Sequence, residues 1–241
     1  MILGVLSVLL MTISSHAVDV DPLTIPPKPE TYLSHISLRL QNIRRYITGR
    51  IPIQRHHLPP CFVDDDGLNS EWGERMIAEK WTKGYCTSVL ELGGGGGSVS
   101  TVIQMNLSDK RNHVVVQPNE DAMFGGLHAL ERNRKACEMQ FTIIDHVLQK
   151  GESGKLLSYV NKPFDCMVVD CENCLVEEFE KNPDLFTHIK YIQVERDDKQ
   201  PLNAVRGSYD ALFEKLKFTK IDSGIGCRGK CATEVWGRSL L

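Results

Sequence analysis

Five consecutive glycines follow a short apolar run, and a carboxylate stands two places before the first of them. The run is Val89-Leu90-Glu91-Leu92, the glycines are Gly93 to Gly97, and the residues from Ser98 onward have helical spacing. A turn without side chains, between a strand and a helix, lets a ligand approach the backbone. A flexible linker is the alternative, but a linker would not separate a strong strand pattern from a strong helix pattern.

The spacing of the glycines distinguishes between kinds of nucleotide site. The dinucleotide pattern G-x-G-x-x-G fails, because Gly93 and Gly95 are followed by Ser98. A phosphate-binding Walker loop lacks its Gly-Lys-Ser/Thr ending. The pattern acidic-x-G-x-G-x-G fits, with Glu91, Gly93, Gly95 and Gly97. It is typical of a nucleoside joined to methionine, which needs no pyrophosphate cradle and whose ammonium group a carboxylate can meet.

Polar residues also stand at the ends of the other predicted strands. Ligands of open α/β sheets bind outside the carboxyl ends of the parallel strands, so these residues are expected to meet on one rim. Glu91 and Gln117 would serve the methionine and ribose parts of the ligand, and Asp145 with His146 would border the adenine. The candidates for orienting or deprotonating an acceptor hydroxyl are Asp170, Glu172 and Glu195. His146 is a second possible base, and the carboxylates could instead bind Mg²⁺ or Ca²⁺.

The elements that would position these residues alternate along the chain. Strand-like runs are predicted at 88–92, 113–117, 140–144, 164–170 and 191–195, with helical spacing between most of them. Such alternation predicts an α/β fold with a doubly wound, Rossmann-like, mostly parallel sheet. Two further runs, 218–222 and 233–237, predict a C-terminal hairpin that adds an antiparallel strand.

Helical spacing is clearest in four places. Before the first strand, Asn69-Ser70 could cap a helix whose apolar face carries Trp72, Met76, Ile77 and Trp81. The other helical sets are Val99, Val102, Ile103 and Leu107; Met123, Leu127 and Leu130; and Val205, Tyr209, Leu212, Phe213 and Leu216.

Four blocks resemble the S-adenosylmethionine-dependent methyltransferases, in particular the FkbM-type group. Besides the glycine pattern, 114–119 is similar to that group's second strand, 164–173 to its fourth and 191–195 to its fifth. The resemblance implies the class I methyltransferase architecture, S-adenosyl-L-methionine as cofactor, and O-methylation of a sugar, glycan or other small hydroxyl compound. Three residues depart from the family pattern: Gln117 replaces an acidic residue, Asn173 a glycine, and Leu175 a residue that is often Glu. The alternative is therefore a catalytically inactive binding module with the same fold.

The net charge and the N-terminal residues indicate which partners and which location to expect. With 241 residues and a net charge of −3, spread without basic clusters, it gives no electrostatic case for nucleic acid. An apolar run from Ile2 to Ile13 precedes small residues ending at Ala17, which predicts a signal peptide at 1–17 and a secreted or lumenal protein. An uncleaved anchor is the alternative, although the run is too short for a stable membrane span. An irregular lead-in or cap is expected at 18–68 and the methyltransferase domain at 69–241.

Eight cysteines, an even number, favour disulfides in an oxidising compartment. Cys171 and Cys174 follow the fourth strand, and Cys227 and Cys231 lie between the last two. These four could form a zinc site, but disulfides are favoured, most of all at Cys227 and Cys231. Three others are interpreted as small buried hydrophobes: Cys86, Cys137 and Cys166.

Overall fold

The structure, a computed structural model, describes residues 58–63, 71–119, 126–196, 208–226 and 231–238. All of them belong to one compact unit, Ile53–Leu241. The expected signal peptide, the cap at 69–70, Met123, Val205, Cys227 and most of the lead-in lie outside the described residues. Within the described residues, no helix is both long enough and apolar enough to cross a membrane.

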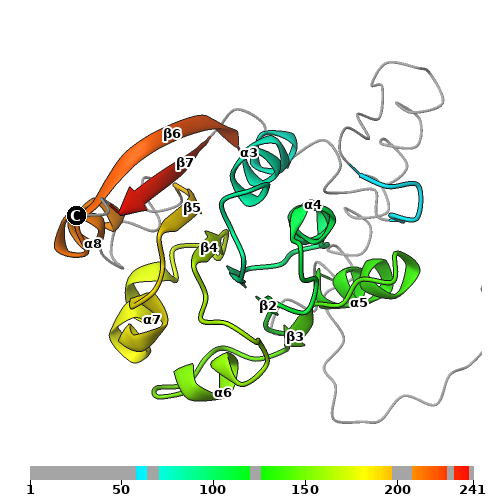
Figure 1. The fold of residues 1–241 in the computed structure, drawn as a ribbon, viewed down its shortest axis with the longest axis horizontal. Coiled ribbons are helices and arrows are strands. Elements are labelled where there is room, and N and C mark those ends of the chain that lie inside the picture. Colours follow the sequence, from blue (N-terminus) through cyan, green and yellow to red (C-terminus); the bar gives the residue numbers. More distant parts are fainter. Residues whose placement is uncertain (1–57, 64–70, 120–125, 197–207, 227–230, 239–241) are drawn as a thin grey trace, which may run out of the picture. The chain divides into compact units, whose positions relative to one another are not determined.

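A seven-stranded sheet forms the centre of this unit, in the order β3-β2-β1-β4-β5-β7-β6 (Figure 1). The first five strands along the chain are parallel, and β7 pairs antiparallel with both β5 and β6. The strands are β1 Val89–Leu92, β2 His113–Val116, β3 Thr142–Ile144, β4 Cys166–Val169, β5 Tyr191–Glu195, β6 Phe218–Gly226 and β7 Cys231–Arg238. The predicted doubly wound sheet with its terminal hairpin is confirmed.

Helices cover both faces of the sheet, because alternate residues of each buried strand point to opposite sides. On one face, Leu90 and Met167 pack in the same apolar cluster as residues of α7, η1 and α8. On the other face, Val89 and Val168 pack with residues of α3 and α4. The helices are α3 Trp72–Thr82, α4 Ser98–Asn106, α5 Gly126–Ala136, α6 Ser153–Leu157, α7 Leu175–Lys181, η1 Pro183–Phe186 and α8 Tyr209–Lys215.

The predicted inner face of α3 is wrong. Trp72 and Met76 are 40% and 39% exposed, whereas Glu74 and Arg75 on the same helix are buried. Ile77 and Ala78 are buried as well, and this side of α3 lies on α4 and the edge of the sheet. The reason is that the rotation of a helix follows all its contacts: Arg75 donates to Ser98 of α4, and Gln193 of β5 donates to the backbone carbonyl of Glu74.

Three disulfides join described cysteines: Cys61–Cys137, Cys86–Cys166 and Cys171–Cys174. The interpretation of Cys86, Cys137 and Cys166 as plain buried hydrophobes is therefore wrong. Sequence spacing gave no sign of two of these bridges, because they join segments 76 and 80 residues apart that only the folded chain brings together. The side chains of Cys227 and Cys231 lie outside the described residues.

The two bridges at β4 should differ in their contribution to stability. A crosslink that closes about 80 residues removes about 4.5 kcal/mol of unfolded-chain entropy, against about 2 kcal/mol for a loop of about four residues. We expect Cys86→Ala with Cys166→Ala to lower the free energy of unfolding about twice as much as Cys171→Ala with Cys174→Ala, measured by urea unfolding. Equal losses of stability in the two variants would contradict the pairing of Cys86 with Cys166 across the longer loop.

Candidate functional site

The glycine turn is held against the neighbouring strand ends. Gly93 has a φ of +87°, and a Cβ atom there would lie 1.7 Å from the carbonyl oxygen of Asp170. At Gly94 a Cβ would lie 2.4 Å from a methyl carbon of Val115, and at Gly97 it would lie 2.8 Å from one of Leu130. The packing of the protein itself therefore requires glycine at these three positions.

Gly95 is different, because its open side faces a pocket. Its φ is +48°, and the nearest atom to a Cβ built there is a carboxylate oxygen of Glu71, 3.7 Å away. The Gly95 N–H donates to the side-chain carbonyl of Gln117 at 2.7 Å. Gln117 thus supports the turn from outside the pocket.

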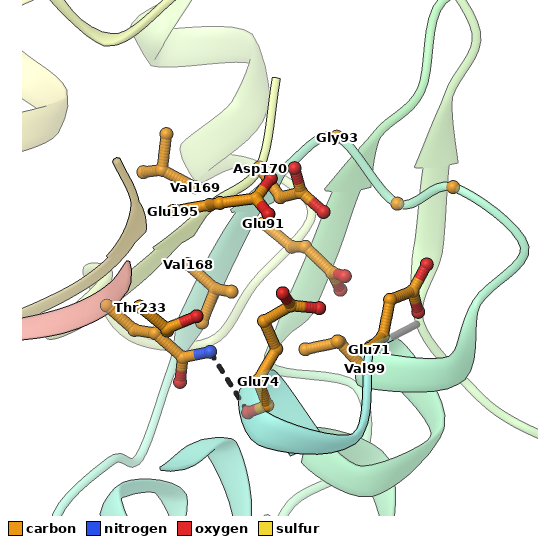
Figure 2. A pocket seen from close by; sticks show the side chains of 13 residues that line it. Glu71, Glu74, Glu91, Gly93, Val99, Val168, Val169, Asp170, Glu195 and Thr233 are labelled. Atoms are coloured by element: carbon orange, nitrogen blue, oxygen red, sulfur yellow. Dashed lines mark hydrogen bonds between the residues drawn. The ribbon is translucent and has the colours of Figure 1, made fainter. Parts of the chain in front are cut away.

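The pocket lies between α3, the glycine turn and the carboxyl ends of β1, β4 and β5 (Figure 2). It encloses about 360 Å³ of space between the atoms, part of which is open solvent. Its lining residues are Glu71, Glu74, Glu91, Gly93, Gly94, Gly95, Val99, Val168, Val169, Asp170, Gln193, Glu195 and Thr233. Five of these are carboxylates and none is basic.

Asp170 and Glu195 form a hydrogen-bonded carboxyl pair in the pocket. Burial raises the pKa of Asp170 well above its usual range, and a hydrogen bond with Glu195 and the charges of Glu195, Glu71 and Glu172 raise it further. Two adjacent carboxyl groups share a proton more readily than they carry two charges. The pair therefore binds a proton more tightly than an isolated aspartate does.

Glu71 and Glu74 approach the pocket from the start of α3. Glu71 accepts a hydrogen bond from Ser98 Oγ, and Arg75 donates to the same hydroxyl at 3.3 Å. Burial lowers the pKa of Arg75, while the charges of Glu71 and Glu74 raise it. The buried guanidinium of Arg75 offsets the negative charges of Glu71 and Glu74.

Glu91 lies at the floor of the pocket, and both its oxygens bond within the protein. Ser100 Oγ donates to one at 2.9 Å, and His113 Nε2 is 3.0 Å from the other. Gln104 Nε2 donates to His113 Nδ1 at 3.1 Å, which leaves the ring proton on Nε2, facing Glu91. This buried network ties α4 and β2 to the strand that leads into the glycine turn.

The structure brings together only part of the predicted site. Glu91, Gly93, Gly95, Asp170 and Glu195 line the pocket. The remaining candidates are not among its lining residues: Gly97, Gln117, Asp145, His146 and Glu172. Glu172 lies two residues after Asp170 in the loop that follows β4, with a φ of +53°. Its side chain is exposed and does not line the pocket.

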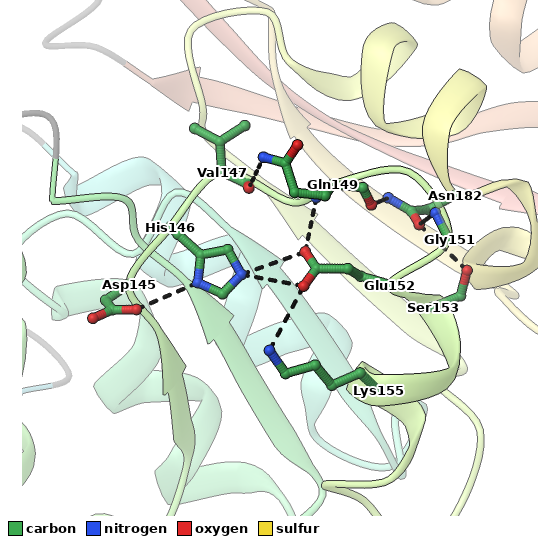
Figure 3. A network of polar contacts seen from close by, with 9 residues as sticks. All are labelled: Asp145, His146, Val147, Gln149, Gly151, Glu152, Ser153, Lys155 and Asn182. Carbon is green, nitrogen blue, oxygen red and sulfur yellow. Dashed lines mark hydrogen bonds and ion pairs between the residues drawn. The ribbon is translucent and has the colours of Figure 1, made fainter.

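Asp145 and His146 belong to a separate polar network in the loop after β3 (Figure 3). His146 Nδ1 lies 3.4 Å from Asp145, and its Nε2 lies 3.4 Å from Glu152. The backbone N–H of Gln149 also donates to Glu152, and this bond, with a smaller contribution from His146, lowers the pKa of Glu152. These contacts order the loop between β3 and α6.

Sequence reasoning missed four polar lining residues: Glu71, Glu74, Gln193 and Thr233. Glu71 and Glu74 are spaced by three, with Ala78 four further on, which places them on one helical face with a buried residue. That spacing was a usable signal. Gln193 and Thr233 are interior strand positions whose place in the pocket depends on the pairing of β5 with β7.

The carboxylates of the predicted site could also have bound Mg²⁺ or Ca²⁺. Among the described residues, no group of three or more Asp, Glu, His or Cys is arranged to hold a metal ion. The Cys171–Cys174 disulfide likewise takes up two of the thiols considered for zinc.

Comparison with known proteins supports the fold. No protein-family model matches the sequence, and no curated protein is significantly similar to it. The solved O-methyltransferase from Bacillus cereus in complex with SAH is 12% identical, with a TM-score of 0.52 over 89% of this chain and 94% of its own. The cofactor-bound Rv0187 from MTB is 10% identical, with a TM-score of 0.52 over 95% of each chain. The fold is the Rossmann-like fold of class I methyltransferases.

The raised pKa of Asp170 predicts a pH-dependent stability. Because the folded state holds this proton more tightly than the unfolded state, the wild type loses stability as pH rises above the ordinary aspartate pKa of about 3.9. We expect Asp170→Asn to raise the free energy of unfolding at pH 7, with a gain that vanishes below about pH 4. Urea unfolding across pH measures it, with the exposed Asp184→Asn as control. A gain that does not depend on pH would contradict the shared proton.

Proposed function

We propose that the protein is an S-adenosyl-L-methionine-dependent methyltransferase that methylates a hydroxyl group of a small molecule, such as a sugar or glycan. The observation that carries the proposal is the position of Gly95: a glycine turn whose open side faces an acidic pocket at the carboxyl ends of β1 and β4. The similarity to two solved structures, an O-methyltransferase in complex with SAH and a cofactor-bound protein, supports it.

The residues of the pocket suit this donor. When bound, it supplies an activated methyl group on a sulfonium and also carries an ammonium. These two positive centres would lie among the five carboxylates that line the pocket. Gly93 and Gly95 would receive its methionine part along the turn, where Glu91 also lines the pocket. Gly97, Gln117, Asp145 and His146 would act from outside the pocket, shaping the turn and the loop that borders the ribose and adenine.

The acceptor hydroxyl must lose a proton as its oxygen is methylated. Asp170 and Glu195 are the proposed catalytic pair, because burial and the neighbouring carboxyl group raise the pKa of Asp170, and a carboxylate with a raised pKa is a stronger base. Asp170 directly follows β4 and Glu195 ends β5, so the sheet holds both carboxyl groups in place. A fixed position of these groups favours alignment of the acceptor. Glu172 would act only indirectly, through its charge on Asp170.

The FkbM-type relationship and the secreted or lumenal location belong to the same proposal. The first depends on the four sequence blocks. The second is supported by three disulfides, which persist in oxidising compartments and are rare in the cytosol. An inactive binding module is the second candidate, since Glu91 and Gln117 both make bonds within the protein.

Calorimetry with the donor, its demethylated product and NAD tests the proposal. We expect binding of S-adenosylmethionine and S-adenosylhomocysteine and none of NAD. Binding of none of the three would favour the inactive module, and binding of NAD alone would contradict the glycine spacing argument.

Gly95→Asp should abolish binding of the donor without unfolding the protein. The backbone at φ +48° tolerates aspartate, while its side chain would occupy the pocket beside Glu71. Gly151→Asp is the matched control, since Gly151 also has a positive φ, +85°, with no atom within 4 Å of a Cβ built there. Undiminished affinity in Gly95→Asp would overturn the placement of the cofactor.

A further inference from the structure

One of the three described disulfides differs from the other two in how little of the chain it closes. Cys171 and Cys174 are three residues apart, whereas the other two bridges join residues 76 and 80 apart. A bridge across a short loop removes little entropy from the unfolded chain, so it adds little stability to the fold. By the same thermodynamic cycle, folding protects such a bridge little against reduction.

Both cysteines of this bridge are also partly accessible to solvent. Cys171 and Cys174 are only partly buried, on the loop between β4 and α7. At the Cys86–Cys166 bridge, by contrast, Cys166 is 2% exposed within β4. Thiol–disulfide exchange requires a thiolate to reach one sulfur of the bridge. The loop bridge is therefore the more open of these two to attack.

The loop that this bridge closes has a backbone that L-amino acids rarely adopt. Glu172 and Asn173, the residues between the two cysteines, have φ angles of +53° and +71°. Left-handed backbone of this kind is unfavourable for residues other than glycine, and less so for asparagine than for glutamate. The covalent link between Cys171 and Cys174 holds the loop ends together in this conformation. Opening the link allows the loop to leave it.

The same loop packs against the glycine turn. A Cβ atom at Gly93 would lie 1.7 Å from the carbonyl oxygen of Asp170 and 3.1 Å from the backbone nitrogen of Cys171. Gly93 and Asp170 both line the pocket (Figure 2). The Asp170 N–H donates to the carbonyl of Leu92 at 2.8 Å, so the sheet fixes the chain up to Asp170 and the bridge restrains it beyond. A change in the loop therefore reaches the pocket wall through the Asp170–Cys171 peptide.

We propose that the Cys171–Cys174 bridge is a reversible redox site, which a dithiol opens while the protein stays folded, and that its opening weakens binding in the pocket. One thiolate of the dithiol attacks a bridge sulfur, the S–S bond of the protein breaks, and a mixed disulfide forms. The second thiol of the reagent then displaces the protein sulfur. The reagent is oxidised to a disulfide, and two electrons and two protons pass to the cysteines, which become thiols.

Weaker binding follows from the loss of a fixed loop. With the bridge closed, the loop beside the glycine turn is already ordered when a ligand arrives. With the bridge open, the ligand must order the loop as it binds, and this entropy cost lowers the affinity. The effect on donor binding rests on the proposed function, whereas the opening of the bridge does not.

Differential labelling of the cysteines tests the redox site. The full chain is equilibrated with mixtures of reduced and oxidised dithiothreitol, free thiols are alkylated, and peptide mapping gives the reduced fraction at each cysteine. We expect Cys171 and Cys174 to be half reduced at a ratio of reduced to oxidised reagent about tenfold or more below that for Cys86 and Cys166, with the circular dichroism still native. Reduction of both bridges at the same ratio, or loss of the native spectrum before Cys171 is labelled, would overturn the proposal.

Titration with S-adenosylhomocysteine tests the effect on the pocket. We expect its affinity to fall about threefold or more at the ratio where the Cys171–Cys174 bridge is open and Cys86–Cys166 is closed, and to return on reoxidation. Cys171→Ser with Cys174→Ser should bind as weakly as the opened wild type, and the dithiol should not weaken it further. Unchanged affinity in the opened wild type, or an equal further loss in the double variant, would refute the coupling between loop and pocket.

The two measurements separate this inference from the proposed function. If S-adenosylhomocysteine fails to bind the oxidised protein, the proposed function fails, and the labelling still decides whether the bridge is a redox site. If S-adenosylhomocysteine binds but the bridge opens only as the protein unfolds, the redox site fails and the proposed function stands.

Discussion

The close approach of the β1 and β4 ends is the constraint on which the site depends. Only a glycine at position 93 lets the chain turn directly over the carbonyl oxygen of Asp170, where any Cβ would overlap it. The contact brings the glycine turn and the first catalytic candidate to the same rim. It also directs the open side of Gly95 toward the start of α3, so that a turn, a strand end and a helix end enclose one pocket.

Electrostatic repulsion is the cost of that arrangement. Five carboxylates line one pocket, and the protein relieves their repulsion in different ways. Glu91 is bonded to Ser100 and His113, Arg75 is buried beside Glu71 and Glu74, and Asp170 binds a proton more tightly than usual. A pocket lined by carboxylates and by no basic residue favours positively charged molecules, and the proposed donor carries a sulfonium and an ammonium.

Several residues that a motif would assign to the ligand instead hold the fold. Gln117 accepts the N–H of Gly95, and Glu91 links α4 and β2 beneath the turn. Gly94 and Gly97 make room for Val115 and Leu130. A sequence pattern records both roles together, because a turn that receives a ligand must first be packed against its neighbours. The burial and bonding of each residue separate the two roles.

The sequence alone determined the order of the strands and four of the helices between and around them. Alternating apolar runs and helical spacing predicted all seven strands, the parallel sheet and the C-terminal hairpin, because both periodicities are local. The strand-end rule also brought Glu91, Asp170 and Glu195 to one rim. Only the tertiary structure decided the rotation of α3, the long-range disulfides of Cys61 and Cys86, and the place of Glu74 and Thr233 in the pocket. These depend on contacts between segments far apart along the chain, and no local pattern encodes which side of a helix or strand those contacts will bury.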